Sequence, residues 1–346
     1  MLYAAHFAAS TPSEATEKRL AMTVFPSRRA CIAVCLLGLS AIAKAQAPAW
    51  PTRPLHIVVG FPAGSSPDIT ARTLAEPLSR ALGQPVIVDN KVGAGGNIAA
   101  EFVARATDRH TIGLMINGNM TIAKMINPKL GYDPLKDFAP ISLIGISPLV
   151  LTAPVGAPGA DARAFLQAAK DAGDRWSYGS PGVGTVGHVG MELLKRRIHI
   201  DPVHVPYPGY PQIANAMIGG ELQLSMLPPT LAAAQARAGK VRAIGVTART
   251  RSTLVPEMPS LAEAGVDDFN LEIWNAVAAP ASMPKPVVAK LSALFSEIVR
   301  SPDMRAKLFQ QGWTAVGSSE EGLANRIRSD AAAMGEVIRS ARITVD

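Results

Sequence analysis

The sequence predicts an α/β protein of two lobes, and three observations lead to this fold class. Short apolar runs alternate along the chain with segments of helical hydrophobic spacing, which is the pattern of βαβ units. The chain has 346 residues, 48% of them hydrophobic, and at about 100–200 residues per domain this length suits two domains. Polar or glycine-containing loops follow predicted strands in both halves, so we expect a ligand cleft between the halves.

The first βαβ unit is the clearest. A strand at Leu55–Val59 leads into a loop, and Ser66 is the expected N-cap of a helix with Pro67 at its first position. The buried stripe of this helix recurs every fourth residue, at Leu74, Leu78 and Leu82. Gly83 is expected to end the helix.

The later units repeat this style. Strands are expected at 85–89, 110–116, 175–178, 203–206, 222–227 and 241–247, with two more inside 140–152. Helices are expected at 98–106 with Asn97 as cap, at 160–172, 188–197 and 212–218, after Pro228-Pro229, and from 286 onwards with a break at 312–319. The chain is expected to cross back near 274–280. We therefore assign 48–153 plus 274–346 to lobe 1 and 154–273 to lobe 2.

Residues 1–47 have the layout of an N-terminal extension and a secretory signal peptide. Arg28 and Arg29 precede an uncharged apolar run at 30–43, and small-x-small sites predict cleavage near Ala45 or Ala47. The run is shorter than the roughly 20 residues that span a bilayer. A buried helix or a short anchor is the alternative, and the initiator is either Met1 or Met22. Export to the periplasm is the prediction.

Composition excludes several classes of function. Both cysteines of the chain, Cys31 and Cys35, precede the predicted cleavage sites, so the exported chain would have no disulfide or thiolate metal site. Five of the 34 basic and two of the 27 acidic residues also precede Gln46, which leaves a small and scattered positive excess. Nucleic-acid binding needs a concentrated basic patch and is not expected. The sequence contains no catalytic motif and no metal-ligand spacing, so we expect no catalysis, no metal site and no cofactor.

Two loops between a strand and a helix are suited to an anion. The first comprises Phe61, Pro62, Ala63, Gly64, Ser65 and Ser66. The second follows Ser180 and contains Gly182, Val183, Gly184 and Thr185, with His188 on the next helix. Free backbone N–H groups at a helix N-terminus attract an anion, and the hydroxyls would add donors. A tight turn without a ligand, or a dinucleotide motif in the second loop, is the alternative. Three further residues follow other predicted strands: Asn117, Asn119 and Tyr207.

Short motifs that occur in order from Trp50 onwards resemble one known family. They are Trp50-Pro51-Thr52-Arg53-Pro54, Phe61-Pro62-Ala63-Gly64 with Asp68, Leu82-Gly83-Gln84-Pro85, Gly93-Ala94-Gly95-Gly96-Asn97-Ile98, Tyr178-Gly179-Ser180 with His188, His204-Val205-Pro206-Tyr207, and Ala262-Glu263-Ala264-Gly265. The family is the Bug family, the extracytoplasmic solute receptors of tripartite tricarboxylate transporters.

The resemblance implies a type II periplasmic-binding-protein fold, with two lobes joined by two crossing strands. It implies a small carboxylate ligand held by backbone amides, hydroxyls and waters of the two anion-ready loops. It also implies a monomer that delivers its ligand to the membrane subunits of a transporter. The alternatives are an orphan receptor used in sensing, or an exported α/β enzyme. Two departures from the family, at Pro208 and at Leu227-Pro228-Pro229, suggest a less charged ligand, such as a monocarboxylate or an aromatic acid.

Overall fold

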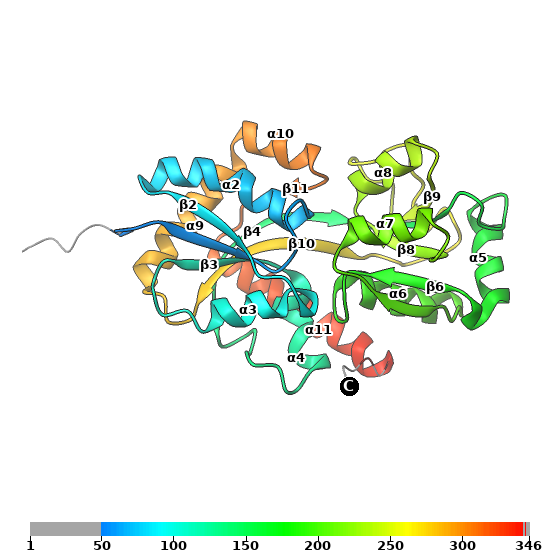
Figure 1. Cartoon of the computed structure of the whole chain (residues 1–346), viewed down its shortest axis with the longest axis horizontal. Coiled ribbons are helices and arrows are strands. Elements are labelled where there is room, and N and C mark those ends of the chain that lie inside the picture. The colour runs from blue at the N-terminus through cyan, green and yellow to red at the C-terminus, as the bar shows by residue number, and fades with distance from the viewer. Residues whose placement is uncertain (1–49, 342, 344–346) are drawn as a thin grey trace, which may run out of the picture. The chain divides into compact units, whose positions relative to one another are not determined.

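The computed structural model describes residues 50–341 and 343, and this part of the chain folds around two mixed β-sheets (Figure 1). The predictions for the signal peptide, its cleavage sites and the two cysteines lie outside the described residues. The strands are β1 (Leu55–Val59), β2 (Val86–Asn90), β3 (Thr111–Ile116), β4 (Phe138–Pro148), β5 (Val150–Pro154), β6 (Ser177–Ser180), β7 (Val203–Pro206), β8 (Leu224–Leu227), β9 (Val241–Val246), β10 (Glu272–Pro280) and β11 (Thr314–Ala315).

The helices cover both faces of each sheet, as expected for α/β architecture. They are α2 (Ser66–Leu82), α3 (Asn97–Ala104), α4 (Ala123–Ile126), α5 (Ala162–Ala172), α6 (Val186–Ile198), α7 (Tyr210–Ile218), α8 (Pro229–Arg237), α9 (Lys285–Arg300), α10 (Pro302–Gln310) and α11 (Glu320–Ala341). Short 3-10 turns lie at Ala94–Gly96 and Gly173–Arg175, and a π-helical turn lies at Gly118–Ile122.

The two sheets have related strand orders. The six-stranded sheet of lobe 1 runs β11-β4-β10-β3-β1-β2, and the five-stranded sheet of lobe 2 runs β7-β6-β8-β5-β9. In each sheet three parallel strands are followed by an antiparallel strand, β10 in lobe 1 and β5 in lobe 2. The chain passes between the sheets twice, once between β4 and β5 and once between β9 and β10. This is the predicted two-lobe architecture with two crossing segments.

The core of lobe 1 follows from the pleat of its central strand. Ile57 and Val59 point into an apolar cluster with Leu74 and Phe295, while Val58 points to the opposite face. Successive side chains of a strand alternate between faces, so one run of apolar residues supplies two layers of core. The five-stranded sheet is buried in the same way between two clusters.

The C-terminal helix contacts the cores of both lobes. Leu323 and Ile327, near the start of α11, belong to a cluster of the six-stranded sheet, whereas Ile338 and Ile343 belong to a cluster of the five-stranded sheet. The end of the chain therefore packs against both lobes, whereas the assignment of 274–346 placed it in lobe 1 alone. The predicted boundary after 153 also falls inside β5, which pairs within the five-stranded sheet.

Some predicted element boundaries were wrong by one or two residues. The N-cap of α2 is Ser65, not Ser66, because Ser65 has extended backbone angles and its carbonyl accepts from Ile69 to close the first turn. Gly96 caps α3, so Asn97 lies within that helix. Strand β6 begins two residues later than predicted, because its residues pair with β7 from Ser177 to Ser180.

Candidate functional site

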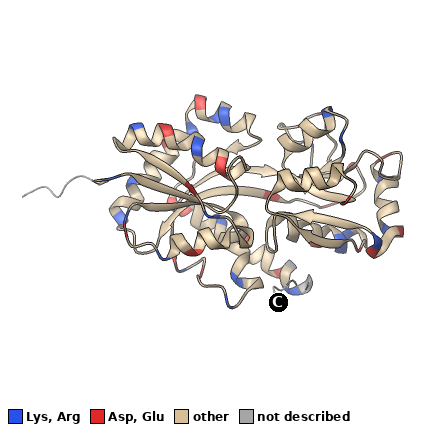
Figure 2. Cartoon of the chain, viewed as in Figure 1, with Lys and Arg blue, Asp and Glu red and all other residues tan. Residues whose placement is uncertain are grey.

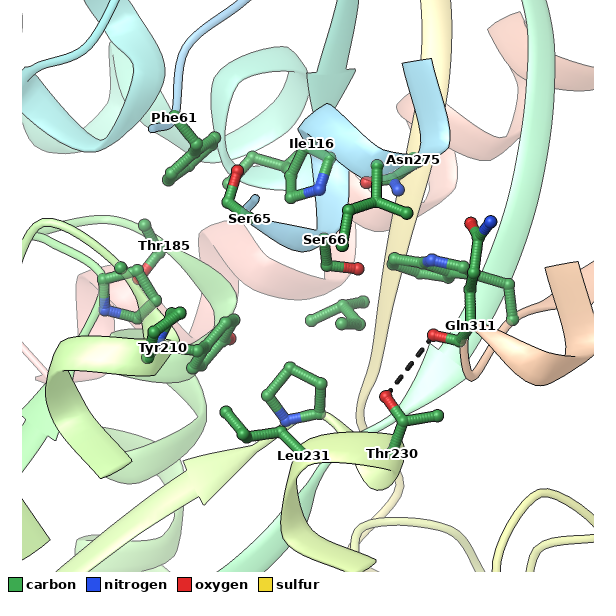
Figure 3. A pocket seen from close by; sticks show the side chains of 18 of the residues that line it. Phe61, Ser65, Ser66, Ile116, Thr185, Tyr210, Thr230, Leu231, Asn275 and Gln311 are labelled. Carbon is green, nitrogen blue, oxygen red and sulfur yellow. Dashed lines mark hydrogen bonds between the residues drawn. The ribbon is translucent and has the colours of Figure 1, made fainter. Parts of the chain in front are cut away.

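A cavity of about 410 Å³ lies between the two sheets, at the ends of strands from both (Figure 3). It is lined by Phe61, Gly64, Ser65, Ser66, Pro67, Ile69, Ile116, Asn117, Pro181, Thr185, Val186, Gly209, Tyr210, Pro211, Pro228, Thr230, Leu231, Ile273, Asn275, Gln310, Gln311 and Trp313. These residues come from lobe 1, from lobe 2 and from crossing strand β10. The cavity is within the size range of small-molecule sites.

Four helices direct their N-termini at this cavity. Its lining includes the caps or first-turn residues of α2 from lobe 1 and of α6, α7 and α8 from lobe 2. A helix N-terminus carries about half a positive elementary charge and unpaired N–H groups. The backbone therefore makes the cavity attractive to an anion.

None of the described residues that line the cavity has a charged side chain. Charged residues of the described chain lie largely along the helices (Figure 2). An anion in this cavity would thus be held by backbone amides and neutral donors, without an Arg or Lys partner. The walls are otherwise apolar, with Phe61, Ile69, Ile116, Leu231 and Trp313 among them.

The first anion-ready loop is fixed by a buried carboxylate. Asp68, only 2% exposed, accepts hydrogen bonds from the Gly64 amide at 2.9 Å, from Arg72 and from Asn90. Burial alone would raise the pKa of Asp68, but its bonds to Arg72, Gly64 and Asn90 outweigh that effect and hold the pKa below its usual value. The Asn90 side chain also donates to the Phe61 carbonyl at 2.8 Å. Asp68 therefore shapes the loop and does not line the cavity.

Six of the predicted site residues line the cavity: Phe61, Gly64, Ser65, Ser66, Asn117 and Thr185. Ser65 and Asn117 are the most informative, because each has a buried oxygen without a hydrogen-bond partner in the described structure. Thr185 lines the cavity, but its hydroxyl donates to the Gly182 carbonyl at 2.8 Å. The Thr185 hydroxyl is thus used inside the loop.

The other predicted site residues do not line the cavity: Pro62, Ala63, Asn119, Ser180, Gly182, Val183, Gly184, His188 and Tyr207. Their polar groups serve the loops themselves. The Asn119 amide donates to the Gly95 carbonyl at 3.0 Å, and the Tyr207 hydroxyl interacts with Glu221. We predicted that the Ser180 hydroxyl contacts a ligand, but in the structure this hydroxyl bonds to the Gly182 carbonyl and to His204.

Ser180 belongs to a buried polar cluster beneath the second loop. Its hydroxyl lies 2.7 Å from His204 Nε2, and the His204 ring stacks on His188 at 4.1 Å between centroids. His188 Nδ1 accepts from the Gly184 amide at 3.2 Å. Burial lowers the pKa of both histidines to about 4, with further lowering of the His188 pKa by Lys195. Both rings are therefore neutral near pH 7, and His188 supports the loop as an acceptor.

The glycine motifs of the two lobes meet at one side of the cleft. A Cβ on Gly182 would lie 3.2 Å from Gly95 Cα, and one on Gly118 would lie 2.8 Å from the Gly184 carbonyl oxygen. Only glycine allows the backbones to approach so closely. This contact brings the motif at 93–97 against the motif at 182–187, of which Thr185 and Val186 line the cavity.

The cavity also contains residues that were not among the predicted site residues. They are Ile69, Ile116, Val186, Gly209, Tyr210, Thr230, Leu231, Ile273, Asn275, Gln310, Gln311 and Trp313, with neighbouring prolines. Burial raises the pKa of Tyr210, so its hydroxyl stays protonated as a donor. Thr230 of lobe 2 makes a long 3.5 Å contact to the Gln311 carbonyl of lobe 1 (Figure 3). Tyr210 and Thr230 follow the predicted strands 203–206 and 222–227, whose ends were expected to face the cleft, whereas Gln311 and Trp313 had no such signal.

The described residues show neither a metal site nor a membrane-spanning helix. No group of three or more His, Cys, Asp or Glu residues in this part of the chain is arranged to hold a metal ion. None of the helices described is both long and apolar enough to cross a membrane.

Comparison with known proteins gives one consistent relationship. A family model described as "Tripartite tricarboxylate transporter family receptor" matches residues 70–343. A protein encoded between tcbD and tcbE in Pseudomonas sp. (strain P51) is 33% identical over 306 residues, which are 88% of this chain and 91% of the relative. MatC of Rhodopseudomonas palustris, solved with malate, is 31% identical with a TM-score of 0.78, over 84% of this chain and 100% of MatC. Another R. palustris protein, solved with adipate, is 28% identical with a TM-score of 0.81, over 85% of this chain and 99% of its own.

Proposed function

The chain belongs to the tripartite tricarboxylate transporter family of receptors, and from this premise we propose that it captures a small carboxylate in the cavity between its lobes. The observation that carries the proposal is the meeting of four helix N-termini at a cavity whose described lining has no charged side chain. The similar proteins solved with malate and adipate support a carboxylate as ligand.

We propose that the carboxylate lies between the start of α2 and the start of α6. Ser65 and Ser66 come from the first lobe and Val186 from the second, so one ligand would touch both. Binding at helix N-termini needs no cationic side chain, because the amides and the helix dipole favour negative charge. A ligand that contacts both lobes would favour their closed arrangement.

The family acts outside the cytoplasm with membrane transport subunits, and we extend this role to the chain. In this proposal the protein is exported, works as a monomer in the periplasm and passes its ligand on unchanged. Cleavage near Ala45 or Ala47 stays a prediction.

A thermal-shift screen with paired probes tests the proposal. Succinate, benzoate and leucine would be compared with succinamide, benzamide and leucinamide, which keep the shape but lack the carboxylate. A ligand at 100 times its Kd stabilises the folded state by about 2.7 kcal/mol, which raises the Tm by several degrees. At least one of the acids should stabilise the protein, and its amide should not. Equal shifts for acid and amide, or no shift with any small carboxylate at millimolar concentration, would contradict it.

A further inference from the structure

Three side-chain amides of the cavity lining share one orientation, in which the nitrogen donates to the protein and the oxygen is left without a partner. The Asn117 side chain donates to the Glu272 carbonyl at 3.0 Å. The Asn275 side chain donates to the Thr70 hydroxyl at 3.4 Å, and the Gln311 side chain donates to the Thr73 hydroxyl at 2.8 Å. In each case the amide nitrogen is engaged, while the amide oxygen is buried and has no partner in the described structure.

The orientation of these amides follows from counting protons. The Thr70 hydroxyl donates its one proton to the Ser66 carbonyl at 2.9 Å, and the Thr73 hydroxyl donates to the Ile69 carbonyl at 2.8 Å. Each threonine can then only accept from a neighbouring amide, so that amide must present its NH₂ group. The backbone carbonyl beside Asn117 can likewise only accept. Flipping any of the three amides would place two acceptors against each other.

The cavity therefore has two kinds of polar group with different partners. The helix N-termini, the Ser65 hydroxyl and the Trp313 indole N–H are donors and suit a carboxylate. The three amide oxygens are buried acceptors on residues of the cavity lining, and a carboxylate placed against them would be repelled. A donor on the ligand would give them the hydrogen bond that buried polar groups in folded proteins nearly always have.

Resting on the proposed function, we infer that the ligand is a carboxylate that also carries a hydrogen-bond donor, either an ammonium or a hydroxyl group, on an apolar body. Asn275 and Gln311 extend from β10 and from the end of α10, close to the start of α2 (Figure 3). The apolar side chains Ile69, Leu231 and Trp313 would contact the body of the ligand. A second carboxylate has no cationic partner among the described lining residues and is disfavoured.

Matched ligand series test this inference by calorimetry on the purified protein. One series is 3-phenylpropanoate, phenyllactate and phenylalanine, which differ only in bearing no donor, a hydroxyl or an ammonium. A second series is 4-methylpentanoate, 2-hydroxy-4-methylpentanoate and leucine. We expect a donor-bearing member to bind at least about tenfold more tightly than its donor-free partner, the scale of one hydrogen bond to a charged or buried group. The preferred member tells ammonium from hydroxyl.

Other outcomes overturn the inference in different ways. The inference fails and the proposed function stands if a donor-free acid binds as tightly as the donor-bearing members of its series. The same holds if succinate binds as tightly as those donor-bearing members. If neither series nor any acid of the thermal-shift screen binds, the proposed function fails and the inference fails with it.

A pair of variants locates the effect. Gln311→Leu removes one acceptor just after helix α10, whereas Gln167→Leu makes the same change at an exposed position of α5 that does not line the cavity. Gln311→Leu should reduce the preference for the donor-bearing ligand from about tenfold to threefold or less, with the affinity of the donor-free acid retained. Gln167→Leu should keep the preference. An unchanged preference in Gln311→Leu, in a protein with a normal Tm, would overturn the role of this amide.

Discussion

Replacing Gly118 by alanine tests whether close contact of the lobes is needed for binding. Gly118 begins the π-helical turn after β3, and its backbone is not in the left-handed region, so alanine adds no strain of its own. The added Cβ would lie 2.8 Å from the Gly184 carbonyl oxygen and 3.4 Å from Thr185 Cα, both in the opposite lobe. These neighbours are backbone atoms, so no side chain can rotate away, and the lobes must separate by several tenths of an ångström.

The size of the effect follows from overpacking. An extra methyl group in a filled space typically costs about 1–3 kcal/mol. If separation of the lobes relieves the clash, this penalty falls on the closed, ligand-bound state, and the Kd should rise about five- to 150-fold. The Tm of the ligand-free protein should change little.

Calorimetric Kd values and ligand-free melting curves of the variant check this prediction. Gly156→Ala is the matched control, because Gly156 also lacks a left-handed backbone and its Cβ would meet nothing within 4 Å. The control should bind like the wild type. Wild-type affinity in Gly118→Ala would refute the reasoning. A loss of ligand-free stability as large as the loss of affinity would show instead that the lobes stay in contact without ligand.

Three further predictions concern Ser65, Asp68, and the histidine pair His188 and His204. Ser65→Ala should leave ligand-free stability unchanged, since its buried hydroxyl has no partner in the described structure, but should weaken carboxylate binding about 10- to 100-fold in calorimetry. Asp68→Asn should lower the free energy of unfolding in urea by about 1–3 kcal/mol and weaken binding, because the loop at Gly64 loses its anchor. His188 and His204, with pKa values of about 4 when folded and about 6.5 when unfolded, bind fewer protons in the folded state between these pH values. Stability should be complete above pH 6.5 and should fall towards pH 4, by at most about 1.4 kcal/mol per pH unit for His188 and less for the partly exposed His204; a flat urea-unfolding profile would contradict this.

The fold could be predicted from the sequence because its signals are local and repeated. The apolar run before Gly60, the leucine stripe of α2 and Gly83 at its end each depend on a few neighbouring residues. The one-residue error at Ser65 and Ser66 has the same origin. Adjacent serines are equally good caps, and only the tertiary position of the loop decides which of them takes the extended conformation.

The use of polar groups could not be predicted in the same way. Ser180 and His204 are 24 residues apart, and they meet only because β6 and β7 are paired in parallel. A hydroxyl in a glycine-rich loop looks like a ligand donor until its partner in the next strand is known. Asn275 and Gln311 illustrate the opposite case, because nothing near them in the sequence marks them as ligand-binding residues. They are candidates only because the fold places β10 and the end of α10 beside α2.

The difference between these two kinds of residue explains why the family is easier to identify than the ligand. The groups suited to the carboxylate are largely backbone amides at helix starts, which many sequences can supply as long as the loops keep their glycine, proline and serine residues. The groups suited to the rest of the ligand are side chains from β3, β10, α8 and the end of α10, held by contacts such as that between Thr73 and Gln311. In our proposal, relatives about 30% identical to this chain can therefore share the carboxylate site and differ in the remainder. In our proposal, ligand choice then depends on which way a few buried amides are turned; the threonines of α2 set the orientation of Asn275 and Gln311, and the Glu272 carbonyl sets that of Asn117.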